Sequence, residues 1–153
     1  MFELVLYQPQ IPPNTGNIIR LCANAGANLH LIHPLGFEIT EKSCRRAGLD
    51  YHALTYVHHY ENWQDFREKS EIKRLFAITK FGTRRYDAPS YQPGDGFLFG
   101  RETTGLPDDI HALFTDETRL AIPMVENSRS LNISNAASII LYEAWRQQSF
   151  TSP

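Results

Sequence analysis

Short apolar segments alternate with longer amphipathic or polar segments along the whole chain. Continuous apolar runs are typical of strands that are buried on both faces. Such strands are predicted over residues 2–7, 29–34, 54–60, 74–79, 96–100 and 119–123. Helices are predicted over residues 14–24, from Thr40 or Ser43 towards Gly48, and over 62–69, 106–114 and 133–145. This alternation predicts an α/β fold, a mainly parallel sheet with helices on both faces.

The last predicted helix has the clearest pattern in the chain. Apolar residues recur at spacings of three and four, which places on one face Ile133, Ala136, Ala137, Ile140, Leu141, Ala144 and Trp145. Asn132 or Ser134 can cap its first turn. Before it, an apolar strand end closed by Pro123 leads into a polar loop. A strand, a polar loop and a helix N-terminus can form a small-molecule pocket, although an ordinary connection that needs no ligand is the simpler interpretation of the pattern alone.

Turn-forming residues mark the limits of other elements. Pro12 and Pro13 are expected to delay the first helix until Asn14, and Gly26 can end it. Residues 80–96 contain turn residues throughout and are predicted to form a loop.

Composition indicates one domain, residues 1–153, with a packed core, because 42% of the residues are hydrophobic. No segment approaches the ~20 apolar residues that span a bilayer, so no membrane association is expected. The N-terminus does not resemble a signal peptide. Two cysteines, Cys22 and Cys44, are too few for a disulfide framework and fit a reducing cytoplasm.

The formal net charge of −2 gives the chain no broad attraction for nucleic acid. An RNA partner would therefore need a local basic patch. Candidate groups are Arg45 with Arg46, Lys73 with Arg74, and Lys80 with Arg84 and Arg85. Basic pairs of this kind are more often simply solvated.

Several common site types are missing from the sequence. It has no dinucleotide-binding or phosphate-loop fingerprint, no Cys/His set with zinc spacing and no hydrolase elbow. Three loops remain as candidates, each after an apolar segment. Residues 14–20 carry Asn14, Asn17 and Arg20 on neighbouring helical turns, residues 99–107 carry Glu102 between glycines, and residues 122–132 precede the last helix. Loops at the carboxyl ends of strands are where α/β sheets bind ligands.

Taken together, NTGNIIRLCANAG, FLFGRETTGLP and IPMVENSRSLNISNAASIILYE resemble the three ordered motifs of the SPOUT superfamily of S-adenosylmethionine-dependent RNA methyltransferases. Their content is most similar to the branch that methylates ribose 2′-hydroxyls. The chain lacks the RNA-binding extensions of larger members. With LYQPQIPPNTGNIIRLCAN and CRRAGLDYH, it resembles the members that methylate the wobble position of tRNA.

That resemblance implies a tRNA (cytidine(34)-2′-O)-methyltransferase that also acts on 5-carboxymethylaminomethyluridine(34). It does not exclude another tRNA position, ribosomal RNA or a non-catalytic RNA-binding dimer, because the motifs describe the donor and the ribose rather than the base. The family also implies a C-terminal deep trefoil knot, a homodimer and a reaction without a metal.

Site residues follow from the same resemblance. S-adenosylmethionine would be held by Ile78, Thr79, Gly100, Glu102, Ile122, Met124, Ser130, Leu131 and Asn132. Arg20 of one subunit would reach the donor of the other, helped by Asn14 and Asn17, and Tyr142 would place the target nucleotide. The anticodon stem-loop of tRNA would contact Arg45, Arg46, Lys80 and Arg129, while Ser128 would line the pocket. Arg101 has no assigned role.

Overall fold

A computed structural model of the chain describes residues 1–46, 48–49 and 51–151. In this part of the chain, seven strands form a single sheet in which every neighbouring pair is parallel, in the order β3-β2-β1-β6-β4-β7-β5. The strands are β1 (Glu3–Tyr7), β2 (Asn28–Ile32), β3 (Val57–Tyr60), β4 (Leu75–Ile78), β5 (Arg84–Arg85), β6 (Gly96–Phe99) and β7 (Arg119–Ala121). The predicted α/β class is confirmed.

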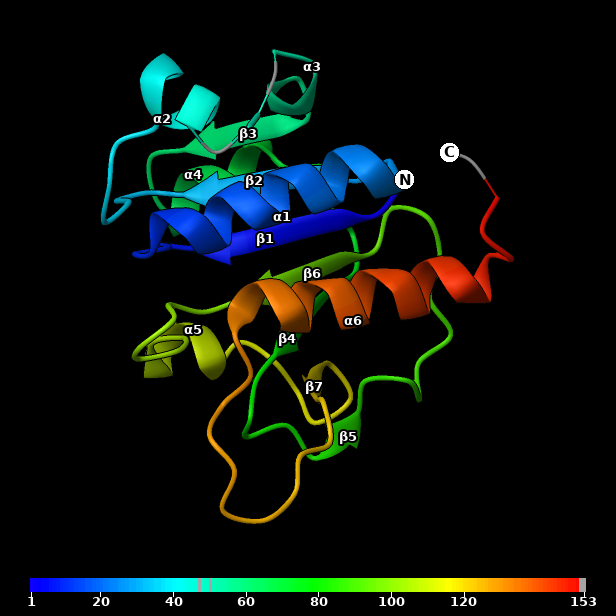
Figure 1. Cartoon of the computed structure of the whole chain (residues 1–153). Coiled ribbons are helices and arrows are strands. Elements are labelled where there is room, and N and C mark those ends of the chain that lie inside the picture. The colour runs from blue at the N-terminus through cyan, green and yellow to red at the C-terminus, as the bar shows by residue number, and fades with distance from the viewer. Residues whose placement is uncertain (47, 50, 152–153) are drawn as a thin grey trace.

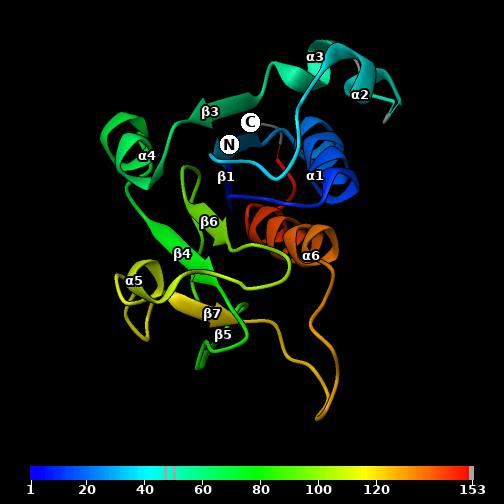
Figure 2. The same cartoon turned by 90° about the vertical axis from the view of Figure 1, so that its left-hand side faces the viewer.

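Helices cover both faces of the sheet (Figures 1 and 2). They are α1 (Pro12–Ala25), α2 (Glu41–Arg46), α3 (Tyr51–Leu54), α4 (Trp63–Lys69), α5 (Asp108–His111) and α6 (Ile133–Gln147). Successive side chains of a strand point to opposite faces. Leu4 and Leu6 therefore pack in the core under α1 and α6, while Val5 and Tyr7 pack in the core under α4 and α5.

Helix α1 begins earlier than predicted. Pro12 and Pro13 form its first turn, because the backbone N–H groups that proline lacks have no intrahelical partner there. Gly26 ends the helix in a left-handed conformation, with φ of 64°. The expected capping of α2 by Thr40 and Ser43 also occurs, since each hydroxyl accepts a hydrogen bond from the backbone N–H of the other residue.

Three other predicted elements were wrong in extent. Residues 54–60 contain the end of α3 and only the shorter strand β3, because an apolar run does not by itself distinguish a strand from a buried helix end. The 80–96 loop contains β5, whose two arginines carry no apolar pattern and pair with β7. Helix α5 is shorter than residues 106–114, and Leu106 and Phe114 pack on the core from outside it.

The sheet order places the carboxyl ends of β4, β6 and β7 next to one another. Ile78 of β4 pairs with Phe99 of β6 and with Leu120 of β7. The segments that follow these strands therefore meet at one edge, beside the start of α6 (Figure 2). No helix in the described part of the chain is long and apolar enough to cross a bilayer.

Candidate functional site

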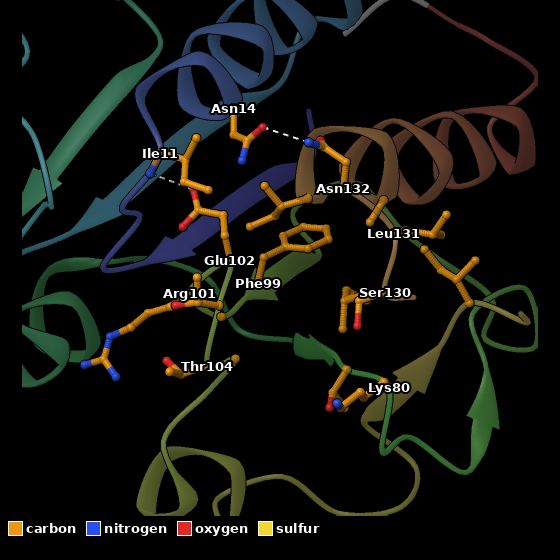
Figure 3. Close-up of a pocket in the computed structure, with 18 of the residues that line it drawn as sticks. Ile11, Asn14, Lys80, Phe99, Arg101, Glu102, Thr104, Ser130, Leu131 and Asn132 are labelled. Atoms are coloured by element: carbon orange, nitrogen blue, oxygen red, sulfur yellow. Dashed lines mark hydrogen bonds between the residues drawn. The ribbon is translucent and has the colours of Figure 1, made fainter. Parts of the chain in front are cut away.

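A cavity of about 460 Å³ opens at this edge of the sheet (Figure 3). Its volume lies in the range of small-molecule sites. All nine residues expected to hold a methyl donor line it, namely Ile78, Thr79, Gly100, Glu102, Ile122, Met124, Ser130, Leu131 and Asn132. Asn14 and Lys80 line it as well. Residues far apart in the sequence are thus brought to one cavity by the strand order.

The starts of α1 and α6 are joined beside this cavity by two asparagines. Asn132 Nδ2 donates a hydrogen bond of 2.9 Å to Oδ1 of the buried Asn14. The Oδ1 atom of Asn132 caps α6 by accepting from the backbone N–H of Ser134 at 2.8 Å. Asn132 therefore performs the capping role that its sequence position predicted, and it also links two of the three candidate loops.

Glu102 connects the 99–107 loop to the residues that precede α1. Its carboxylate accepts hydrogen bonds from the backbone N–H groups of Gln10, at 2.9 Å, and Ile11, at 3.1 Å. Both residues immediately precede α1. The negative charge of Glu102 is thus used to hold the chain before α1 against the cavity wall (Figure 3).

The segment from Gly100 to Gly105 folds back tightly on the end of β6. A Cβ atom at Gly100 would lie 2.3 Å from the backbone carbon of Gly105, so only glycine fits there. The turn is closed by backbone hydrogen bonds of 3.1 Å and 2.9 Å between Arg101 and Gly105. Glycine at position 100 therefore allows the loop to form one wall of the cavity.

Arg101, to which the sequence assigned no role, has a structural one. Its guanidinium donates hydrogen bonds to the side-chain oxygen of Gln8 and lies 5.4 Å from the centre of the Tyr7 ring. It thereby fastens the second loop to the end of β1.

The mouth of the cavity carries exposed apolar groups beside a cation. The ring of Phe81 is 68% exposed, and the Lys80 ammonium lies 5.1 Å from its centre. Met124 and Leu131, from the 122–132 loop, also line the cavity and are exposed. Apolar side chains, polar side chains and Lys80 together line the cavity, which suits a small organic ligand that carries polar groups.

Other predicted site residues lie outside this cavity. Asn17 and Arg20 line a separate cavity of about 440 Å³ between α1 and the 37–49 segment, together with Arg46. The three candidate residues of α1 are therefore divided between two cavities. Because a helix has 3.6 residues per turn, residues spaced three apart point in different directions around its axis.

Four further predicted residues are exposed and line neither cavity. Arg45 is on α2, Ser128 and Arg129 are on the loop before α6, and the Tyr142 ring lies 5.7 Å from that of Trp145 on α6. Ser128 therefore does not line the pocket as expected.

Sequence reasoning did not single out several lining residues. Ile11 and Phe81 lie outside the three candidate loops, whereas the 99–107 loop contains Phe99, Arg101, Thr103, Thr104 and Gly105, and α6 contains Ile133 and Ala136. Ile133 and Ala136 were assigned only to the apolar face of α6, and the pattern does not show that this face ends at a cavity. Within the described residues, no group of three or more His, Cys, Asp or Glu side chains could hold a metal ion.

Comparisons with known proteins agree with this geometry. Residues 1–142 match the model of the SpoU rRNA Methylase family. A tRNA (cytidine(34)-2′-O)-methyltransferase of Methylovorus glucosotrophus (strain SIP3-4) is 53% identical over 150 residues, which cover 98% of this chain and 97% of that protein.

Solved structures show the same similarity. One described as giving structural insights into the 2-OH methylation of C/U34 on tRNA has a TM-score of 0.87 and 40% identity, covering 97% of this chain and 91% of the other. An AdoMet-bound rRNA methyltransferase from Sinorhizobium meliloti has a TM-score of 0.83 and 25% identity, covering 99% of this chain and 57% of the other.

Proposed function

Because this chain belongs to the SpoU rRNA methylase family, we propose that it methylates the 2′-hydroxyl of nucleotide 34 in tRNA, with S-adenosylmethionine as the methyl donor. Cytidine and 5-carboxymethylaminomethyluridine are the proposed target nucleosides. The observation that carries this proposal is full-length identity above one half to an enzyme named for that reaction. A tRNA substrate implies that the enzyme works in the cytoplasm.

The fold of this family carries a trefoil knot formed near the C-terminus. In this chain, the C-terminal end of α6 is fastened to the segment between β5 and β6. Gln147 donates to the carbonyl of Pro89 at 3.1 Å and accepts from the N–H of Tyr91 at 2.8 Å. These contacts hold the C-terminal end of α6 in place. The first residues of the same helix line the cavity of about 460 Å³, which is the proposed donor site and is called the donor cavity below.

The cavity residues fit the methyl donor in size and chemistry. Its wall consists mostly of residues at strand ends and in loops. The backbone of such residues offers N–H and C=O groups to an adenine, so no charged side chain is needed to bind the base. The apolar side chains of Ile78, Ile122 and Leu131 provide flat contact area. Bound there, S-adenosylmethionine supplies a sulfonium-activated methyl group, and alignment of the acceptor hydroxyl is the main task of the protein.

Arg20 is the proposed catalytic residue. A guanidinium keeps its proton at neutral pH, so it serves to stabilise negative charge that develops on the 2′-oxygen and to hold the adjacent phosphate. Asn17, on the same cavity wall, would orient Arg20 or the ribose. Asn14 would act from the donor cavity and Tyr142 from α6.

Arg20 does not line the donor cavity of its own chain. The proposed role therefore requires a homodimer in which Arg20 of one subunit reaches the donor bound by its partner. Lys80, at the cavity mouth, and Arg129, on the exposed loop, would add positive charge for the anticodon stem-loop. Arg45 and Arg46 on α2 are the remaining proposed RNA contacts.

The reaction is tested by incubating the protein with labelled S-adenosylmethionine, bulk tRNA and ribosomal RNA, followed by nucleoside mapping. Label on the ribose of nucleotide 34 is expected. Label only in ribosomal RNA, or in neither RNA, would overturn the proposed substrate. Charge reversal at Arg45 and Arg46 is expected to weaken tRNA binding and to lower its dependence on salt.

The role of Arg20 is tested by mixing two inactive variants. Arg20→Ala is expected to bind the donor normally but not to transfer methyl, whereas Ser130→Trp would fill the donor cavity from an exposed position. Mixed dimers contain one site with both an intact cavity and an intact Arg20, so activity should return on mixing. A mixture that stays inactive, although subunits exchange, would show that Arg20 does not act across the dimer.

A further inference from the structure

A third cavity, of about 850 Å³, opens at the edge of the sheet opposite the donor cavity. It is lined by Leu75, the first residue of β4, and by Thr118, which precedes β7. The donor cavity lies at the other ends of these two strands, near Ile78 and Ile122. A single nucleotide in the donor cavity cannot also reach this one.

Positive charge dominates this cavity, although the whole chain has a net charge of −2. Its cationic lining residues are Arg67, Lys73, Arg74 and Arg84, while Glu117 is the carboxylate among the lining residues. In the part of the chain that the structure describes, no salt bridge holds the exposed Arg67 and Lys73. These two cations are therefore available to an anion.

The other two arginines are held in place by the protein itself. Arg74 donates to the buried carboxylate of Asp95 at 3.0 Å and to the carbonyl of Ser90 at 3.0 Å. Arg84 donates to the carboxylate of Glu117 at 2.7 Å and to its carbonyl at 3.0 Å. Both guanidinium groups are therefore already paired within the protein.

One partly exposed aromatic ring lies beside these cations. The guanidinium of Arg67 lies 5.9 Å from the centre of the half-buried Trp63 ring, whereas that of Arg74 lies 5.3 Å from Phe76, which is buried in the core. Cations that follow a phosphate backbone, next to rings on which bases stack, are typical of proteins that bind single-stranded nucleic acid. An acidic peptide would use the cations but would not need the rings.

We propose that this cavity binds a segment of the tRNA outside the anticodon loop, with an unpaired base on Trp63 and its phosphates on Arg67 and Lys73. The proposal rests on the proposed function for the identity of the RNA. The amino ends of β4 and β7 would then form a second binding site for the tRNA. A whole tRNA would contact both sites, whereas an isolated anticodon stem-loop would not contact this second one.

The double variant Arg67→Gln/Lys73→Gln tests the charge contribution. It is expected to bind full-length tRNA about tenfold more weakly, with a salt slope smaller by about 2. Affinity for the isolated anticodon stem-loop, and its methylation, should match the wild type. The control Lys69→Gln/Arg146→Gln removes two exposed charges that do not line the cavity and should behave as wild type. Equal affinity of both double variants for full-length tRNA would overturn the proposal.

Trp63 offers a second readout that does not depend on a variant of the cavity. In a Trp145→Phe background it is the remaining tryptophan, and full-length tRNA is expected to quench its fluorescence whereas the stem-loop is not. Equal quenching by poly-glutamate would overturn the assignment to RNA. If the wild type bound tRNA in this cavity without methylating it, the proposed function would fail while the cavity assignment stood.

Discussion

The side-chain amide of Asn132 donates a hydrogen bond of 2.9 Å to the side-chain oxygen of Asn14, 118 residues earlier in the chain. The same Asn132 caps α6 through its oxygen. One side chain thus caps the start of α6 and joins the first and third candidate loops beside the donor cavity. Stability and donor binding are expected to be coupled at this position.

Two substitutions at Asn132 separate these roles. Asn132→Ala removes the cap and is expected to lower the free energy of unfolding by about 1 kcal/mol. Asn132→Ser keeps a capping hydroxyl but is too short to reach Asn14, so its stability should stay close to the wild type. Both variants should bind S-adenosylmethionine more weakly by calorimetry. Normal donor affinity in the serine variant would show that the contact with Asn14 has no part in binding.

Glu102 is expected to hold the chain before α1. Replacing its carboxylate by an amide in Glu102→Gln leaves one good acceptor for the two N–H groups of Gln10 and Ile11. A loss of about 1 kcal/mol is expected, since Glu102 is partly exposed. Hydrogen exchange should accelerate at those two amides and not in the exposed-residue control Glu71→Gln. Unchanged protection of both amides would contradict this role.

Gly100 is expected to be required for steric reasons. Gly100→Ala places a methyl group against the backbone of Gly105 and Leu106 and should cost about 2 kcal/mol or more, with loss of donor binding. Gly94→Ala is a contrasting control, because φ is +93° there, unlike at Gly100, and no heavy atom lies within 4 Å of the added Cβ. That variant should lose about 1 kcal/mol and keep donor affinity. A loss at Gly100 no larger than at Gly94 in urea unfolding would contradict the steric role of Gly100.

Stability is expected to fall in mild acid through the pair His33 and His59, whose ring nitrogens lie 2.9 Å apart. Burial, followed by the neighbouring charge of His33, lowers the pKa of His59 below its ordinary value of 6.5. The folded state then binds a proton less readily than the unfolded state, so stability is complete above pH 6.5 and is lost as the pH falls below it.

Urea unfolding at pH 7.5 and pH 5.5 measures this effect. The variant His59→Gln should lose less stability between the two values than the wild type. The difference is expected to be small, because His59 is only partly buried and solvent screens its charge. The same pH dependence in both proteins would remove this pair as its cause.

Local features of the fold were predictable from the sequence because their causes are local. The apolar face of α6, its cap at Asn132 and the end of α1 at Gly26 each depend on residues within one or two helical turns. The family resemblance also indicated nine residues that line one cavity, and the parallel sheet brings the strand ends near them to one edge. The extent of α3 and the strand β5 were missed, because their residues form no periodic apolar pattern.

What the sequence determined by itself is therefore the order of most strands and helices, several of their boundaries and the family to which the chain belongs. Only the tertiary structure decided that β6 lies between β1 and β4, that Arg101 fastens a loop to β1, and that Asn14 and Arg20 face different cavities. The spacing of apolar residues along the sequence predicts which face of its own helix or strand a residue lies on. Distances between elements depend on how the whole sheet is assembled, and no local pattern contains them.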